Sequence, residues 1–281
     1  MRVLNIVVPA ELLARWADWY APDTQPFLVD ARLAETVGVA ADPTAPPPEL
    51  RDTYETYGAD VARIWLSEAE FGRLPRPHRA ALVRAQVTLG RGIVPSVTAW
   101  APVLGDAVRA QADGYRFVWW PSLLRGHEAR VLTEYVEEGR RPSRHDEVPA
   151  AVWAAAARTL PGARALAGTF AAASGPNCFG TVMAAAGVAG AGTVWMQREP
   201  FEDWLAGVTV PGGRDDEPGT VLVWRSPDGL VQHAAVTLGG GWALHKPSQG
   251  WMSPTKVLTV TDVKRSARQP GRRLHRYAIG A

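Results

Sequence analysis

Apolar and polar residues follow a different period in each half of this chain. In the first half, apolar residues recur at helical spacing between prolines, which predicts helices over about 10–20, 50–72, 77–89 and 126–139. One stretch departs from this pattern, YRFVWWPSLL at 115–124, whose aromatic density predicts a buried strand. The alternative for that stretch is an aromatic platform beside a binding site. The first half is therefore expected to be mainly helical.

The second half changes from helical spacing to strict alternation. Alanine-rich helices are predicted over about 149–159 and 161–173, and another begins near Cys178. Alternating strands follow, so the class is α+β, with a helix preceding an antiparallel sheet. The polar, proline-bearing segment 139–149 is typical of a linker and predicts two domains, 1–145 and 146–281. The predicted strands cover 220–225, 230–238, 242–247 and 257–263, with a last one in LHRYAIG.

The sequence Pro176-Asn177-Cys178 has the pattern of a helix start. Asn177 is a favourable N-cap, and Cys178 then falls in the first turn, where free backbone amides and the helix dipole favour the thiolate. The amide of Cys178 is also placed to hold an oxyanion during acyl transfer. The alternative is that Cys178 is a small buried apolar residue of an alanine-rich helix.

Two histidines stand twelve residues apart in the hairpin VQHAAVTLGGGWALH, at His233 and His245. If the three glycines 239–241 form a three-residue loop, Leu238 faces Trp242 and Val236 faces Leu244. Both imidazoles then lie on one face of the hairpin, on diagonal positions of neighbouring strands. A thiol, a base and a residue to orient that base are the parts of a cysteine acyl-transfer triad. We therefore expect Cys178 as nucleophile, His233 as base and His245 as the orienting residue.

The order of these residues resembles the NlpC-type cysteine peptidases of the papain-like superfamily. The stretch PGTVLVWRSPDGLVQHAAVTLGGGWALHKP is similar to that family's strand leading into a His-containing strand and a third polar residue, and the similarity covers roughly 150–281. The resemblance implies a papain-like C-terminal domain and the same three roles for Cys178, His233 and His245. Asn177-Cys178-Phe179-Gly180 stands where the family usually has Asp-Cys-Ser-Gly, which predicts a substrate other than peptidoglycan.

Three functions remain open from the sequence. The first is a cytoplasmic hydrolase or peptidase that cleaves an amide bond of a small peptide or acyl substrate through a thioester on Cys178. The second passes the acyl group to an amine or alcohol, as an amide-forming transferase would. The third is an inactive papain-like binding module with Cys178 buried and its pKa raised. Asp262, predicted on a late strand, is a rival to His245 as third residue.

Composition removes several other classes. A net charge of +2 without interleaved basic and aromatic residues gives no reason to expect nucleic acid as a partner, and no apolar run reaches the length of a membrane span. A single cysteine excludes internal disulfides and a cysteine zinc cluster. No phosphate-binding glycine loop or metal motif is present, so we expect no cofactor and no metal. No export signal is evident near the start, which leads us to expect a cytoplasmic protein.

Overall fold

The computed structural model describes residues 1–57 and 61–280 and divides the chain into two compact units. The C-terminal unit combines Met1–Val8 with Val136–Ala281, and the N-terminal unit is Pro9–Tyr135. The division thus falls after Tyr135 and not near residue 145. The expected linker belongs to the C-terminal unit because its backbone is hydrogen-bonded there: the Ser143 amide donates to the Leu4 carbonyl at 2.8 Å, and the Arg144 amide to the Val257 carbonyl at 2.8 Å.

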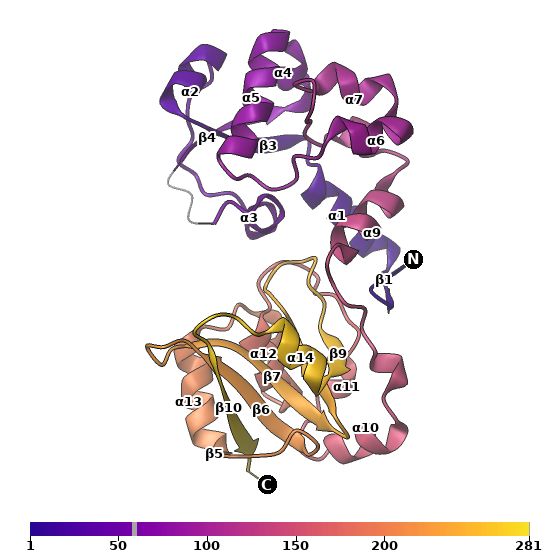
Figure 1. The fold of residues 1–281 in the computed structure, drawn as a ribbon, viewed down its shortest axis with the longest axis vertical. Helices are drawn as coiled ribbons and strands as arrows, with labels where there is room; N and C mark the ends of the chain where they lie inside the picture. Colours follow the sequence, from indigo (N-terminus) through magenta and orange to yellow (C-terminus); the bar gives the residue numbers. More distant parts are fainter. Residues whose placement is uncertain (58–60, 281) are drawn as a thin grey trace. The chain divides into compact units, whose positions relative to one another are not determined.

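The N-terminal unit is mainly helical, as expected, and its helices surround a two-stranded antiparallel sheet of β3 and β4 (Figure 1). Phe27, Ile64, Phe71 and Trp120 pack together in its core. The Phe27 and Phe71 rings stack with centroids 5.6 Å apart. The elements are α1 (Ala10–Tyr20), β3 (Thr24–Val29), α2 (Ala31–Val37), α3 (Pro48–Tyr54), β4 (Ala62–Ser67), α4 (Glu68–Arg73), α5 (Arg76–Thr88), α6 (Val97–Leu104), α7 (Asp106–Gln111), α8 (Pro121–Leu124) and α9 (Glu128–Glu137).

Two predictions for this unit were wrong. The expected helix over 50–72 is three elements, because Ile64 and Leu66 of β4 alternate into the core and Ser67 starts α4 with a capping box. Residues 58–60 of that prediction lie outside the described part of the chain. The segment 115–124 is no strand. Phe117, Trp119 and Trp120 are buried in the core and Tyr115 is exposed, but the bridge of this segment to another is a single pair, Ser96 with Arg116.

The C-terminal unit contains a six-stranded antiparallel sheet in the order β5-β10-β6-β7-β8-β9, preceded in the chain by α12. The α+β class is therefore confirmed. Within the described residues no helix is both long and apolar enough to cross a membrane. The elements are β1 (Arg2–Val3), β2 (Ile6–Val7), η1 (His145–Glu147), α10 (Ala150–Ala156), α11 (Ala163–Leu166), α12 (Cys178–Ala185), η2 (Ala191–Thr193), α13 (Arg198–Val208), β5 (Thr209–Pro211), β6 (Pro218–Arg225), β7 (Val231–Gly239), β8 (Trp242–His245), β9 (Lys256–Thr259), α14 (Val260–Ser266) and β10 (Arg273–Ile279).

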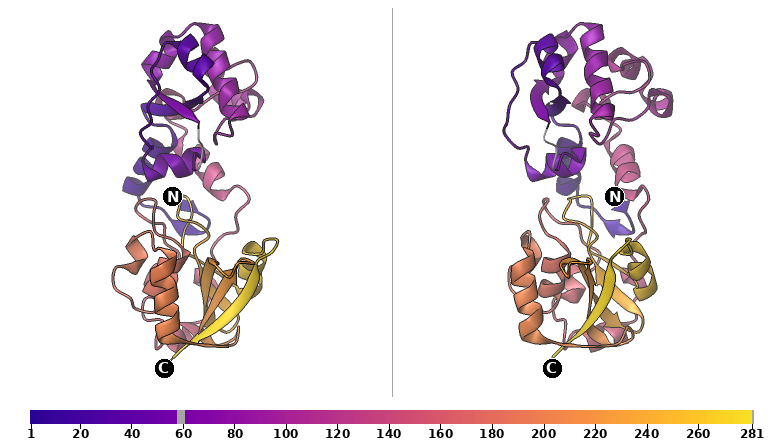
Figure 2. Two further views of the ribbon diagram at one scale, coloured as in Figure 1. Left: turned by 90° about the vertical axis from the view of Figure 1, so that its left-hand side faces the viewer. Right: turned by 60° about the vertical axis from the view of Figure 1, so that its left-hand side comes forward.

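The sheet buries both faces, and Figure 2 shows α13 and α14 on its opposite sides. One face, with Ala234, Val236 and Leu244, packs against α12 and α13. The other face, with Leu222, Trp224, Ala235, Ala243 and Leu258, packs against α14. Burial on both faces explains why β6 and β7 read as nearly continuous apolar runs in the sequence.

The strands β7 and β8 pair in the predicted register, but the turn between them is not the predicted three-residue loop. Val236 pairs with Leu244 as expected, but Trp242 pairs with Gly239 and not with Leu238. The turn itself is Gly240 and Gly241, and Leu238 is an extra residue that forms a bulge. The bulge offsets the shorter turn, so the side chains keep the faces that a three-residue loop would give them.

Candidate functional site

Cys178 is the first residue of α12, and the start of this helix is tightly held. The Asn177 side chain accepts a hydrogen bond from the Gly180 amide at 3.1 Å and donates to the Met196 carbonyl at 2.8 Å. A Cβ on Gly180 would lie 2.2 Å from the Ala191 carbonyl oxygen, so only glycine allows this approach of η2. The predicted N-cap and the position of Cys178 in the first turn are both confirmed.

The thiol of Cys178 is buried, with 8% of the residue exposed. Burial raises its pKa to about 11, although hydrogen bonds from the backbone of Ala234, Phe179 and Cys178 itself and the charge of Lys246 act in the opposite direction. The start of the helix therefore lowers the pKa of Cys178 as expected, but desolvation raises that pKa by more. In the resting protein at neutral pH, Cys178 is a thiol and not the thiolate that its position alone favours.

His233 on β7 and His245 on β8 contact each other across the hairpin. Their Nε2 atoms are 2.9 Å apart, and the two ring planes are perpendicular, with centroids 5.0 Å apart. Both residues are buried, and the Trp224 ring lies beside His233 at 5.4 Å. The prediction that the two imidazoles share one face of the hairpin is confirmed.

Both imidazoles are neutral at pH 7. Burial lowers the pKa of His233 to about 4, with the charge of Arg272 acting in the same direction. Burial also lowers the pKa of His245 well below its ordinary value, helped by His233 and Lys256. A contact between two neutral Nε2 atoms requires one nitrogen to donate and the other to accept. The ring contact therefore couples the tautomer of one histidine to that of the other.

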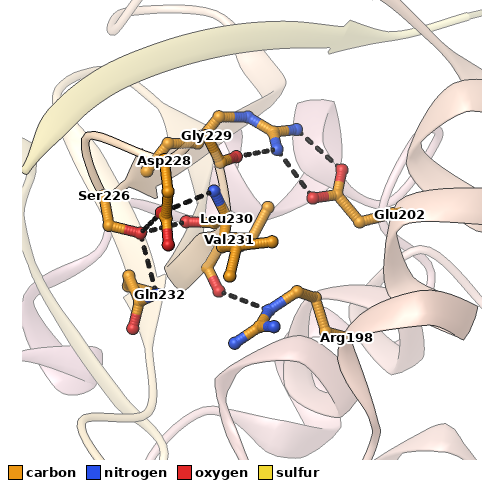
Figure 3. Close-up of polar contacts among 9 residues, drawn as sticks. Arg198, Glu202, Ser226, Asp228, Gly229, Leu230, Val231 and Gln232 are labelled. Carbon is orange, nitrogen blue, oxygen red and sulfur yellow. Dashed lines mark hydrogen bonds and ion pairs between the residues drawn. The ribbon is translucent and has the colours of Figure 1, made fainter.

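The turn before β7 fixes where His233 stands. Arg225 at the end of β6 makes two hydrogen bonds to the Glu202 carboxylate of α13, at 2.6 and 2.7 Å. Arg198, on the same helix, donates to the Val231 carbonyl at 3.1 Å (Figure 3). In the pairing of β6 with β7, Val231 is opposite Arg225 and His233 is opposite Trp224. Gln232 is therefore an inserted residue, and the register shifts there. The shift sets His233 on the face of Trp224.

The thiol and the histidine pair lie on opposite faces of the sheet and share no direct hydrogen bond. The sulfur of Cys178 lies against the backbone of Ala234, which directly follows His233 in β7. Ala234 faces α12, whereas His233 faces the side of the sheet that packs against α14. Among the described residues, no hydrogen bond joins the Cys178 thiol to either imidazole. The structure thus brings the two histidines together and brings the thiol to the neighbouring residue of the strand.

Asp262 lies on α14 and not on the strand expected over 257–263, because β9 ends at Thr259 and that residue caps the helix. Its carboxylate accepts hydrogen bonds from Arg141 at 2.7 Å and from the Thr259 hydroxyl at 2.8 Å. His245, in contrast, contacts His233 directly. The geometry favours His245 over Asp262 as the residue that orients His233.

Lys246 is a site residue that the sequence analysis missed. It directly follows His245, is 2% exposed, and donates from Nζ to the Ser253 carbonyl. With Pro176 and Thr181 it lines a cavity of about 240 Å³. The signal in the sequence was a lysine at the end of an apolar strand in a chain whose other basic residues are nearly all arginine.

The chain was compared with known proteins, and no family model, curated protein or solved structure matches it.

Proposed function

We propose that the C-terminal unit is a papain-like thiol hydrolase that cleaves an amide bond of a small peptide or acyl substrate through a thioester on Cys178. The observation that carries this proposal is the 2.9 Å contact between the Nε2 atoms of His233 and His245. Burying two imidazoles costs free energy, and histidine is the side chain best suited to proton transfer near neutral pH, so the buried pair favours a role in proton transfer. The helix-then-sheet order of α12 and β6 to β9 supports the same arrangement.

The tautomer of His233 decides whether it acts as a base. If its Nε2–H donates to Nε2 of His245, its Nδ1 carries a lone pair, and Nδ1 makes no hydrogen bond within the described residues. His245 then holds its own proton on Nδ1, a buried atom without a partner. In this tautomer His245 orients the ring and also stabilises the imidazolium that forms when His233 takes a proton.

The reaction follows from these groups. Nδ1 of His233 accepts the thiol proton as the sulfur of Cys178 attacks the amide carbonyl carbon. The carbon–nitrogen bond breaks, the departing amine takes the proton from His233, and a thioester remains on Cys178. Water, activated by His233, then hydrolyses that thioester. Backbone amides of Cys178 and Ala234, which surround the sulfur, supply donors for developing negative charge.

In this structure the ring of His233 lies on the α14 face of the sheet and the thiol on the α12 face. The proposed proton transfer therefore requires the start of β7 to rearrange and bring His233 to the α12 face. Because the resting pair consists of a thiol with its pKa raised to about 11 and an imidazole with its pKa lowered to about 4, no ion pair forms before substrate binds. Transfer must therefore be concerted with attack on the carbonyl carbon. A buried site also favours an amine or alcohol over water as acceptor, which keeps the amide-forming transferase as a variant of the same chemistry.

The burial of Cys178 favours a second function, a binding module without catalysis. A thiol that is 8% exposed, with its pKa raised and no hydrogen bond to His233, matches what such a module requires. In that case the two histidines stabilise the hairpin, and Cys178 fills space beneath Ala234.

Trapping the thioester separates the two functions. The protein is incubated with p-nitrophenyl acetate and quenched in acid, and its intact mass and a peptide digest are recorded. The hydrolase predicts one acetyl group on Cys178, formed with a burst of p-nitrophenol and absent in Cys178→Ala and His233→Ala. A module predicts no burst and no acetyl group on Cys178. Circular dichroism of each variant checks that it is folded.

A further inference from the structure

A cavity of about 240 Å³ opens beside the first turn of α12. Pro176 stands two residues before Cys178, and Thr181 lies one turn after it on the same helix. The segment 170–174 forms one wall, and Thr255 and Lys246 form another. Residues that precede and follow the proposed nucleophile in the chain therefore line this cavity.

Lys246 gives the lining of this cavity a positive charge. Of the described residues that line it, Lys246 alone is charged, and no carboxylate stands among them. The ammonium group donates to the Ser253 carbonyl, and its charge also acts on the Cys178 thiol. Burying an ammonium group in an apolar unit is costly. Lys246 lines the cavity and its charge also reaches the thiol, and an ammonium group in such a wall attracts an anion.

The remaining walls combine the apolar side chains of Leu166 and Phe170 with small and hydroxyl-bearing residues. Ala171, Ala172 and Ala173 contribute methyl groups, and Thr181 and Thr255 contribute hydroxyls that donate and accept hydrogen bonds. The volume lies below the range of pockets that hold drug-sized ligands, so a group about the size of one small amino acid fits. Lys246 and the hydroxyl groups of the lining suit a short polar group that carries negative charge.

We propose that this cavity binds a carboxylate of the substrate, with Lys246 as its partner, so that the substrate class is a small amide or peptide bearing a free carboxylate next to the scissile bond. This inference depends on the proposed thiol chemistry only in that it calls the bound molecule a substrate. The binding of a carboxylate beside Cys178 stands or falls by itself.

Two alkylating reagents that differ in charge test the subsite. Iodoacetate carries a carboxylate and iodoacetamide does not, while both transfer a two-carbon group to sulfur. The ratio of their alkylation rates at Cys178 is measured in the wild type, in Lys246→Met and in Lys264→Met, which removes the same charge from outside the cavity. We expect Lys246→Met to lower the ratio about tenfold, the effect of losing one charge-assisted hydrogen bond. An equal ratio in all three proteins overturns the subsite.

Carboxylate binding is also measured without any reaction. Succinate is titrated at constant ionic strength into ¹⁵N-labelled protein, and the amide signals of residues 171–174 are followed. The proposal predicts a saturable shift that disappears in Lys246→Met and in Ala173→Leu, which fills the cavity but keeps the lysine, and that survives in Lys264→Met. Absence of a saturable shift in the folded wild type overturns the subsite. Saturable binding in a protein whose Cys178 resists both reagents would support the subsite and contradict the proposed hydrolase.

Discussion

The Nε2 atoms of His233 and His245 lie 2.9 Å apart although a two-residue turn alone would place the two rings on opposite faces of the hairpin. The bulge at Leu238 restores the register, and with it the pairing of Val236 with Leu244. Because strand side chains alternate between faces, the loss of one residue from a hairpin that keeps its bulge moves every following side chain to the other face. The histidine contact therefore depends on the number of residues between the two strands.

Deleting Gly240 should separate the two histidines. If the shortened hairpin keeps its bulge, β8 turns over and His245 can no longer accept from His233. Loss of the bulge at Leu238 would instead leave Gly239 and Gly241 as the turn and keep Val236 opposite Leu244. We expect the acetylation rate of Cys178 to fall at least tenfold, while the N-terminal unit keeps its own unfolding transition. The matched control is Gly229→Ala in the turn before β7, where an added Cβ meets no neighbour and the φ of 83° costs only backbone strain. An unchanged rate in a deletion variant whose pairing of β7 with β8, read from cross-strand NMR contacts, has shifted would contradict the dependence on register.

Replacing His245 should impair the reaction less than replacing His233. In the proposed reaction His233 takes the proton and His245 orients its ring, and an orienting residue contributes less than the base. His245→Ala should therefore retain more of the rate of Cys178 acetylation than His233→Ala, and His245→Asn should retain more still because its amide oxygen can accept from His233. Burst kinetics on the folded variants give the three rates. Equal losses in the two alanine variants would indicate that the roles are shared or exchanged.

Asn177 should matter for stability more than an ordinary N-cap. Asn177→Ala loses the acceptor for the Gly180 amide and the donor to the buried Met196 carbonyl, so the free energy of unfolding of the C-terminal unit should fall by about 2 kcal/mol. Asn177→Asp keeps the cap but loses the donor, so its free energy of unfolding should lie between those of the wild type and Asn177→Ala. Urea unfolding followed by tryptophan fluorescence measures this order. A loss no larger in Asn177→Ala than in Asn177→Asp would show that the cap contributes nothing.

The buried histidine should make the protein sensitive to mild acid. Since burial lowers the pKa of His233 from 6.5 to about 4, the unfolded chain takes up a proton below pH 6.5 that the folded protein refuses until about pH 4. Stability is therefore full above pH 6.5 and falls as the pH drops from 6.5 toward 4, by about 3 kcal/mol for this group. The fall between pH 7 and pH 4.5 should shrink in His233→Asn and persist in His275→Asn, a control at an exposed position. Equal falls in all three proteins would show that His233 is not responsible.

Much of the C-terminal unit could be predicted from the sequence because its signals are local. The apolar runs of β6, β7 and β8 and the Asn177 cap depend on neighbouring residues, so these strands and the start of α12 were predicted correctly. The register was predicted correctly, although the bulge at Leu238 was not, since a bulge and a longer loop shift the strand by the same amount.

The failures arose where distant contacts override local pattern. Ile64 and Leu66 have the two-residue spacing of a strand, but their run is too short to stand out from the helical pattern around it, and pairing with β3 makes it a strand. Asp262 follows an alternating run, but Thr259 caps a helix there. The pKa of Cys178 depends on how deeply tertiary packing buries its sulfur, which the helix start alone does not reveal. The cavity at Lys246 combines segments far apart in the chain and has no local signature.

The most direct test of the central claim is the rate of Cys178 alkylation by iodoacetamide against pH, in the wild type and in His233→Ala. If neutral His233 takes the proton of the neutral thiol during attack, the wild-type rate is flat between about pH 4 and about pH 11, the two pKa values that burial sets. In His233→Ala the rate should be far lower at pH 7 and rise about tenfold per pH unit until the thiol ionises. A wild-type rate that already rises tenfold per unit and matches the variant would contradict the account and leave Cys178 as a buried residue of a binding module.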